Sequence, residues 1–355
     1  MICFKYIFWL SVGSIMYTTI FYYYFLKIFR KKQYIIDSNY YPNVTLIICA
    51  YNEEKCIRDK LLNTLDIDYP RDNLQVVLAD DGSTDKTVEI AKEFDSVEIL
   101  KLSRSGKTSA QNEAVKIARN EILVFSDANN IYNKDALKKL VRNFSDERVG
   151  VVCGELQYRN KISGESSYWK YEVAIKKAES KRGWLLGANG SIYAVRKNVF
   201  VPLPEDSISD QLEPILVYGK GFDVVYEPRA IAIEDPPNNV IQRKRRIILR
   251  SLVSMKYILN LLNPFKERSV FFPYVSHKLI RWFFPLFLLL CFLSSFYLAK
   301  SSSFFQTIFI FQVITYTLGF FHPGFRYILK VMIASALAII DWLLGKKQTI
   351  WAVNR

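Results

Sequence analysis

Apolar residues are unevenly spread along the chain, and the first apolar run lies at its start. Residues 7–29 are almost wholly apolar and aromatic, and Arg30, Lys31 and Lys32 follow directly. A helix of this length crosses a bilayer, because each residue adds about 1.5 Å. The charges follow the run and no small-residue cleavage site comes after them, so the pattern favours a retained anchor over a cleaved signal peptide. The positive-inside rule places the end of this anchor, residues 1–32, in the cytoplasm.

Short β-branched runs alternate with helical patterns in the middle of the chain. VTLIICAY, LQVVLADD and VEILKL predict strands, and NEEKCIRDKLLNTL and TDKTVEIAKEF predict the helices between them. This alternation is typical of a parallel sheet covered by helices. Ligands bind such sheets beyond the carboxyl ends of the strands. The pattern therefore predicts an α/β domain over residues 43–241, with its site at that edge of the sheet.

The pattern changes again after this domain. Residues 242–277 are basic and amphipathic, which is typical of an interfacial segment. Residues 278–345 contain three apolar runs, of which the first two are long enough to span a bilayer. The third carries Lys330 and Asp341, so a crossing, a re-entrant turn and an interfacial position all stay open. If it crosses, the basic tail, residues 346–355, lies outside, against the positive-inside rule; otherwise the tail stays in the cytoplasm.

The composition narrows the chemistry that the domain can perform. Half of the 355 residues are hydrophobic and the formal net charge is +14, but the basic clusters lie beside apolar segments. Anionic headgroups attract such clusters and no nucleic-acid motif accompanies them, so membrane lipids are expected partners and nucleic acid is not. The five cysteines are scattered, odd in number and without CxxC spacing, so they indicate neither a disulfide framework nor a zinc site. Both histidines, His277 and His322, lie in the membrane-associated part, so a metal in the domain must use oxygen ligands.

Three of the predicted strands end in polar clusters rich in acids. Such residues are costly in a core and suitable for a binding site, so we expect them to surround a ligand. Asp127, with the amide of Asn129 two residues on, is suited to a divalent cation that also contacts a diphosphate. Turn and helix-cap sequences are the alternative interpretation. The clusters are Ala50-Tyr51-Asn52-Glu53, Asp80-Asp81-Gly82-Ser83-Thr84-Asp85 and Phe125-Ser126-Asp127-Ala128-Asn129.

In this order, the motifs AYNEE, DDGSTDKT, GKTSAQNEAV and FSDAN resemble the family 2 glycosyltransferases with their GT-A fold. Later segments continue the resemblance, and SHKLIRWFFP and the closing W..VNR are similar to the membrane-bound bacterial branch related to polysaccharide synthases. The resemblance implies a GT-A-like Rossmann-type mixed sheet with flanking helices, and transmembrane helices at both ends. It also implies a multi-pass protein of the inner (plasma) membrane with a cytoplasmic catalytic domain.

The activity that the resemblance implies is an inverting sugar transfer in cell-envelope or exopolysaccharide synthesis. The donor is a nucleotide diphosphate sugar, with UDP as the commoner choice, and the acceptor is a saccharide or a lipid-linked molecule. The implied cofactor is a divalent cation, Mn²⁺ or Mg²⁺, bound by Asp127 with help from Asn129. Relatives often have a second aspartate at the position of Asn129, so this second contact is expected to be weaker or indirect.

The resemblance also assigns the nucleotide-sugar site. Asp81 holds the nucleobase or ribose with Asp80 behind it, and Lys107 contacts the diphosphate. The complete set is Ala50, Tyr51, Asn52, Glu53, Asp80, Asp81, Lys107, Asp127 and Arg245.

Asp210 lies where the family places its catalytic base. A carboxylate there accepts the proton of the acceptor hydroxyl as that hydroxyl attacks the anomeric carbon. A helix N-cap is the alternative interpretation, because Ser209 and Asp210 precede a predicted helix and Asp is a favoured N-cap residue.

The segment QRKRR resembles the QxxRW signature of processive synthases, with Arg246 in the tryptophan position. Arg245 is suited to pairing with the pyrophosphate. The missing indole removes a stacking platform, which argues against processive chain extension. A basic helix that faces lipid headgroups is the alternative interpretation.

Glu172 and Glu179 lie seven residues apart, on one face of a predicted helix that also carries Lys176. The pattern favours a solvent-exposed charged stripe over binding of acceptor hydroxyls.

Two other functions stay open. One is a processive synthase that passes a polymer through its own membrane segments, and the other is a non-catalytic sugar-nucleotide sensor or assembly scaffold. Asp81, Asp127 and Asp210 together favour an enzyme, because a pure binder has little use for a base.

Overall fold

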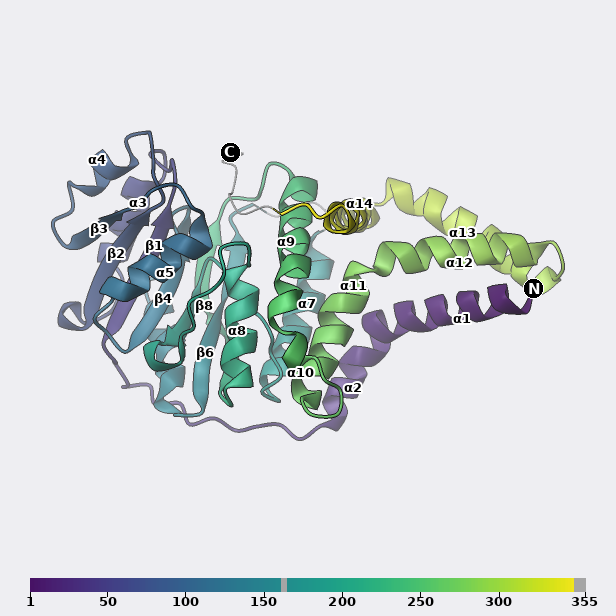
Figure 1. Ribbon diagram of the computed structural model, residues 1–355, viewed down its shortest axis with the longest axis horizontal. Helices are drawn as coiled ribbons and strands as arrows, with labels where there is room; N and C mark the ends of the chain where they lie inside the picture. Colours follow the sequence, from purple (N-terminus) through teal and green to yellow (C-terminus); the bar gives the residue numbers. More distant parts are fainter. Residues whose placement is uncertain (161–164, 348–355) are drawn as a thin grey trace.

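The computed structural model describes residues 1–160 and 165–347. Figure 1 shows a body of sheet and helices at one end and a group of long helices extending from it. The closing W..VNR segment and most of the predicted tail, residues 346–355, lie outside the described residues.

The body is built on a mixed sheet, which has eight strands in the described part of the chain. The strand order is β3-β2-β1-β4-β7-β6-β8-β5. The four strands β1 to β4 run parallel, whereas β7 is antiparallel to both of its neighbours and β5 is antiparallel to β8. The predicted α/β class with a mixed sheet is confirmed. The strands are β1 (Val44–Ala50), β2 (Leu74–Asp80), β3 (Val97–Lys101), β4 (Ile122–Asp127), β5 (Asn130–Tyr132), β6 (Val149–Tyr158), β7 (Tyr193–Arg196) and β8 (Asp223–Glu234).

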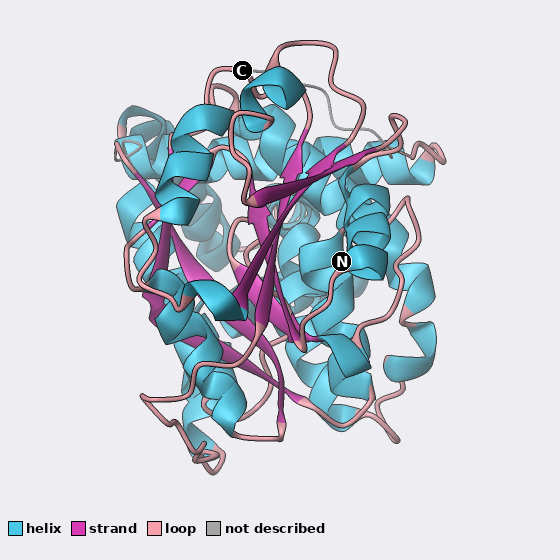
Figure 2. Cartoon of the chain, turned by 90° about the vertical axis from the view of Figure 1, so that its left-hand side faces the viewer, coloured by secondary structure: helices cyan, strands magenta, loops and turns pink. Residues whose placement is uncertain are grey.

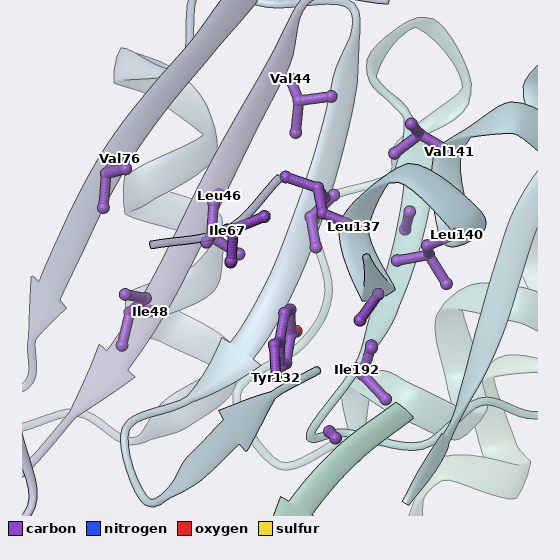
Figure 3. Packing of buried hydrophobic residues seen from close by; sticks show 14 of the residues in the cluster. Val44, Leu46, Ile48, Ile67, Val76, Tyr132, Leu137, Leu140, Val141 and Ile192 are labelled. Atoms are coloured by element: carbon purple, nitrogen blue, oxygen red, sulfur yellow. The ribbon is translucent and has the colours of Figure 1, made fainter. Parts of the chain in front are cut away.

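Helices cover both faces of the sheet (Figure 2). They are α3 (Ile57–Leu65), α4 (Thr87–Ala91), α5 (Lys107–Ile117), α6 (Ala136–Val141) and α8 (Ser209–Gly219). Leu46 and Ile48 of β1 face α3, α4 and α6, and Ile47 and Cys49 face α5 and α8. Figure 3 shows the first of these layers, with Leu137 of α6 packed near β1. Because both of its faces are covered, β1 is buried along its whole length, which explains its continuous apolar sequence.

A third apolar cluster joins the body to the helices that follow it. It contains Ile215 of α8, Leu252 of α9 and Ala338 of α14. The remaining helices in this part are α7 (Glu165–Ser180), α9 (Val240–Ser254), α10 (Arg268–Pro273), α11 (Ile280–Trp282), α12 (Phe284–Ala299), α13 (Ser303–Phe321) and α14 (Pro323–Leu343). Short turns of 3₁₀-helix are η2 (Arg71–Asn73), η3 (Arg142–Ser145), η4 (Lys197–Val199), η5 (Met255–Tyr257) and η6 (Leu259–Leu261), and η7 (Tyr274–Leu279) is a π-helical turn.

The N-terminal apolar run is helical almost throughout. It comprises α1 (Ile2–Met16), the π-helical turn η1 (Tyr17–Phe21) and α2 (Tyr22–Ile28). In Figure 1, α1 runs beside α12 and α13. Within the described residues, α13 and α14 are long and apolar enough to cross a membrane, and the count rises to three if the bent segment containing α12 is one span.

The apolar run predicted to span at residues 280–299 is not one straight helix. It changes direction by 60° between the segment Arg268–Trp282 and α12. Pro285 lies in the first turn of α12. Proline has no N–H to continue the preceding helix, so a new helix begins at this point.

The third apolar run forms α14, which packs along α9. In Figure 1, α14 is seen end-on, whereas α1, α12 and α13 extend across the view. Ala334, Ala338 and Asp341 are buried on one side of α14. The helix therefore lies across the other long helices, against the body.

Glu213 of α8 is a carboxyl group in the core of the body. Its side chain is fully buried, and the Tyr193 hydroxyl donates to its Oε2 at 3.1 Å. Its Oε1 has no hydrogen-bond partner among the described residues. Burial raises the pKa of Glu213 to about 8.

We expect Glu213→Gln to stabilise the protein by a margin that grows as the pH rises. Between about pH 4.3 and pH 8 the folded state keeps a proton that the unfolded state loses, so the stability of the wild type falls through that window. Each pKa unit corresponds to about 1.4 kcal/mol. The melting temperature of the detergent-purified variant should exceed that of the wild type more at the upper end of the window. Glu89→Gln, at an exposed position of α4, is the control, and an equal margin at all pH values would contradict the account.

Candidate active site

A cavity of about 950 Å³ lies at the carboxyl ends of β1 and β4. The segments that follow β1, β4 and β8 form one side of it, and α9 with the end of α14 forms the other. This is the sheet edge where the sequence places the site. Six of the predicted site residues line the cavity: Tyr51, Asn52, Glu53, Asp127, Asn129 and Arg245.

The segment after β1 is tied to the segment after β2. Asn52 adopts a positive φ of 52°, a conformation that asparagine tolerates better than most residues. Its Oδ1 accepts a hydrogen bond from the Thr84 N–H at 2.8 Å, and its own N–H donates to Ser83 Oγ at 2.9 Å. The Glu53 N–H donates to Thr87 Oγ1 at 2.8 Å. These bonds hold two of the predicted polar clusters side by side at the cavity.

Asp81 faces a loop of the protein rather than the cavity. Its carboxylate is fully buried and accepts from the Ser105 N–H at 2.8 Å, the Gly106 N–H at 2.9 Å and Arg104 Nη1 at 2.6 Å. Asp80 is also buried and accepts from the Ser83 N–H at 3.1 Å. Contact between Asp81 and a nucleobase stays a prediction, and it requires this loop to release part of the carboxylate. Ala50, predicted with them, belongs to the core.

Arg104 is a residue that the sequence analysis missed. Its guanidinium lies over the ring of Tyr51, 3.2 Å from the ring centroid. Asp81 fixes this arrangement through the ion pair with Arg104. The available signal was a basic residue three positions before Lys107, in the loop that follows β3.

Lys107 connects the predicted cation ligand to the loop beside Asp210. Its Nζ donates to Asp127 Oδ1 in a short ion pair and to the Gly190 carbonyl at 3.1 Å. Burial lowers the pKa of Lys107, but nearby negative charges, chiefly that of Asp127, outweigh this effect and raise it overall. Contact between Lys107 and a diphosphate stays a prediction.

Asp210 lies in the first turn of α8, and its Oδ2 accepts from the Gly190 N–H at 3.1 Å. The N-cap interpretation is wrong: Ile208 is the N-cap residue, no side chain caps the helix, and the Asp210 carboxylate points to another segment. Burial raises the pKa of Asp210, while the charge of Lys107 opposes that shift. Asp210 is joined to Asp127 through Gly190 and Lys107.

Ser191 and Glu234 complete the surroundings of Asp127, and the sequence analysis missed both. The Ser191 hydroxyl lies 3.3 Å from Asp127 Oδ2 and 3.0 Å from Glu234 Oε2. Arg243 of α9 donates to Glu234 Oε1 at 2.6 Å. Glu234 is the last residue of β8, as Asp127 is the last residue of β4. A search for acids at the ends of predicted strands would therefore have identified it.

A buried lysine, Lys60, holds the loop that follows Asp127 through a hydrogen bond to Asn130. Lys60 of α3 is fully buried, and its Nζ donates to Asn130 Oδ1 at 2.9 Å. Burial lowers the pKa of Lys60 to about 7. The Asn130 amide in turn donates to the Asp127 carbonyl at 3.0 Å. Lys60 and Asn130 are 70 positions apart in the sequence, so no local sequence pattern predicts their contact.

Arg245 lines the cavity, and its guanidinium is held by a carboxylate. Its Nε donates to Asp341 Oδ2 of α14 at 2.5 Å. Lys346 donates to the other oxygen of Asp341 at 2.9 Å. The alternative interpretation of α9, a basic helix that faces lipid headgroups, did not foresee that Arg245 pairs with Asp341 of the same chain.

The residues present fit a hard divalent cation. Asp127 and Asn129 offer oxygen atoms on the same cavity wall, and the ammonium of Lys107 already pairs with Asp127. No group of three or more His, Cys, Asp or Glu side chains among the described residues is arranged to enclose an ion by itself. Such a cation would therefore take its other ligands from water and from a bound diphosphate.

Three comparisons relate this chain to known glycosyltransferases. Residues 45–199 match the sequence model of the family described as Glycosyl transferase family 2. The chain is 27% identical over 242 residues to the poly-beta-1,6-N-acetyl-D-glucosamine synthase of Staphylococcus epidermidis, covering 63% of this chain and 57% of that protein. The synthase of Staphylococcus aureus (strain COL) is 28% identical over the same length. The chain thus spans 57% of the length of these relatives.

A solved structure extends the likeness to nearly the whole chain. It is the mannosyltransferase PcManGT from Pyrobaculum calidifontis in complex with GDP-Man and Mn²⁺, with a TM-score of 0.80. The match covers 97% of this chain and 99% of that one at 21% sequence identity, so it shows the fold. The predicted GT-A-like fold is confirmed, and residues 45–199 of this chain are similar to glycosyl transferase family 2.

Proposed function

We propose that this glycosyltransferase moves a sugar from a nucleotide diphosphate sugar to a saccharide or lipid-linked acceptor with inversion at the anomeric carbon. The observation that carries the proposal is the connection Asp127–Lys107–Gly190–Asp210. It joins the residue suited to a cation and diphosphate to a buried carboxylate suited to a base. A donor and an acceptor held at its two ends would meet between them.

The donor is proposed to lie in the cavity with its diphosphate toward Asp127 and Arg245. Tyr51 and Arg104 offer a flat surface for a nucleobase, because aromatic rings and guanidinium groups stack on such faces. A divalent cation, Mn²⁺ or Mg²⁺, held by Asp127 and Asn129 would neutralise charge on the diphosphate. The relatives are named as N-acetyl-D-glucosamine polymer synthases and the structural neighbour holds GDP-Man, which supports a nucleotide-sugar donor; we propose a UDP-sugar.

Asp210 is proposed to act as the base. It removes the proton of the acceptor hydroxyl as that oxygen bonds to the anomeric carbon, and the bond from that carbon to the diphosphate breaks. The raised pKa of Asp210 suits this task, because a stronger base accepts the proton more readily. Lys107 pairs with Asp127 in the structure. When the donor is bound, Lys107 would leave that carboxylate and pair with the leaving diphosphate instead.

The membrane arrangement is proposed from the exposed apolar side chains of α1, α12 and α13. Phe311 and Leu318 of α13 and Leu289 of α12 are examples of these exposed side chains. The end of α14 carries Asp341 to Arg245 at the cavity, which supports α14 lying along the membrane surface instead of crossing it. The body and the start of the basic tail would then share the cytoplasmic side of the inner (plasma) membrane, as the positive-inside rule requires.

A processive synthase is the second candidate, because the curated relatives carry that name. Arg246 in the tryptophan position of the QxxRW-like segment argues for single additions. The length of the product separates the two activities.

Asp210→Asn should lower the turnover number by at least about 10²-fold while nucleotide-sugar binding changes little, because a general base typically contributes 10²–10⁴-fold. Transfer and donor affinity would be measured separately on the detergent-purified full chain. Asp206→Asn, four residues away and paired with Lys256 on the surface, is the matched control. Wild-type turnover in Asp210→Asn would remove Asp210 from the reaction.

Asp127→Asn and Asn129→Asp should shift the metal requirement in opposite directions. Losing the carboxylate of residue 127 should raise the Mn²⁺ concentration for half-maximal transfer by about tenfold or more, while a second carboxylate at residue 129 should lower it. The measurement is transfer against Mn²⁺ concentration at saturating donor. If both variants keep the wild-type requirement, the cation does not bind at this loop.

A further inference from the structure

The loop from Gly187 to Ser191 connects Asp210 to a second group of charged residues. At one end, the Gly190 N–H donates to Asp210 Oδ2 and the Gly190 carbonyl accepts from Lys107. At the other end, a Cβ added to Gly187 would lie 3.6 Å from Lys278 Nζ and 3.9 Å from its Cε. Next to Gly187, the Ala188 N–H donates to the Asp210 carbonyl at 2.6 Å, so the loop brings Lys278 near the residue proposed as the base.

Lys278 lacks a carboxylate partner among the residues that the structure describes. It lies in η7, is partly buried, and makes no hydrogen bond or ion pair with an acid there. The two acids nearby on α7 are engaged elsewhere. His277 contacts Glu179 at 2.9 Å and Glu172 at 3.2 Å, and Arg281 forms an ion pair with Glu172.

This pairing corrects the interpretation of Glu172 and Glu179 as a solvent-exposed stripe. Glu179 is 1% exposed and also accepts from the Tyr22 hydroxyl at 2.7 Å. The face of α7 that carries these acids packs against α2 and η7, which the spacing of the residues could not reveal.

Lys176 brings a second ammonium to the same loop. Its Nζ donates to Asn189 Oδ1 at 2.8 Å and lies 5.6 Å and 5.8 Å from the ring centroids of Trp169 and Tyr226. No acid within the described residues forms an ion pair with it. Two ammonium groups beside one short loop repel each other, and an anion between them would relieve that repulsion.

We propose that Lys278 and Lys176 bind a phosphate group of the acceptor beside Asp210. The inference rests on the proposed function and deepens it, because it names the chemical class of the acceptor. Phosphate suits the site since it carries up to two negative charges and accepts several charge-assisted hydrogen bonds. The chain runs from η7 through α11 directly into α12, so Lys278 lies on the segment that leads into the long apolar helices. A lipid phosphate and a soluble sugar phosphate share this chemistry.

Gly187 has a defined part in this site. Apart from its chain neighbours, only the end of Lys278 lies within 4 Å of the position that a Cβ would take, so the space beside the glycine is open. Its φ is not positive, so a larger residue is not strained there. A leucine at this position would occupy the space in front of the Lys278 ammonium.

The test measures how tightly the detergent-purified full chain binds two phosphates and their neutral counterparts. The pairs are farnesyl phosphate with farnesol, and glucose 1-phosphate with glucose. The wild type should prefer a phosphate, and Lys278→Met should lose about tenfold or more of its affinity, with Lys278→Arg retaining most of it. Gly187→Leu should also weaken phosphate binding, whereas Gly187→Ala should not. Lys92→Met, at an exposed position of the body, is the control.

Nucleotide-sugar binding with Mn²⁺ is measured on the same samples. A lysine-dependent preference for farnesyl phosphate alone supports a lipid phosphate, and one for both phosphates supports the shared chemistry. An equal affinity of the wild type and Lys278→Met for both phosphates, with donor binding intact, overturns the inference and leaves the proposed function standing. A wild type that binds no nucleotide sugar overturns both.

Discussion

The ion pair between Lys107 and Asp127 is the contact on which the rest of the site depends. Two acids, Asp127 and Asp210, lie near one another at the sheet edge, and removing them from water is costly unless a positive charge compensates. The Lys107 ammonium supplies that charge, and through the Gly190 carbonyl it also positions the loop that contacts Asp210. The pair thereby links Asp127 to the loop that contacts Asp210, the two ends at which we propose that the donor and the acceptor bind. A cation and a diphosphate can replace the lysine at Asp127 with the charge still balanced.

The basic residues of α9 follow the same rule of charge compensation. Arg243 pairs with Glu234 at the end of β8, and Arg245 pairs with Asp341 at the end of α14. These contacts fasten the sheet, the basic helix and the last long helix around one cavity. Two of the positive charges that suggest lipid headgroups in the sequence are therefore compensated by carboxylates of the protein. The arrangement explains how segments about a hundred residues apart can enclose the cavity in which we propose that the donor binds.

The sequence predicts the elements of this site better than their contacts. β1, β2 and β4 and the acids that end them follow from period and composition, because parallel strands bring their carboxyl ends to one edge. The roles of Ser191, Glu234 and Lys60 depend on contacts between distant segments, which no local pattern encodes. For Asp81, the motif is recognisable in the sequence, but the loop that covers its carboxylate is not. That loop comes from residues 104–106. The position of α14 likewise depends on packing against α9, since its composition alone also fits a membrane span.

The most direct test of the central ion pair is Mn²⁺ affinity measured in the absence of nucleotide, for the wild type, Lys107→Met and Lys107→Arg. If the ammonium occupies the position that a cation takes at Asp127, Lys107→Met should bind Mn²⁺ more tightly than the wild type, and Lys107→Arg should resemble the wild type. Equal or weaker binding by Lys107→Met would show that the lysine does not compete with the cation, and would contradict the exchange on which this account is built.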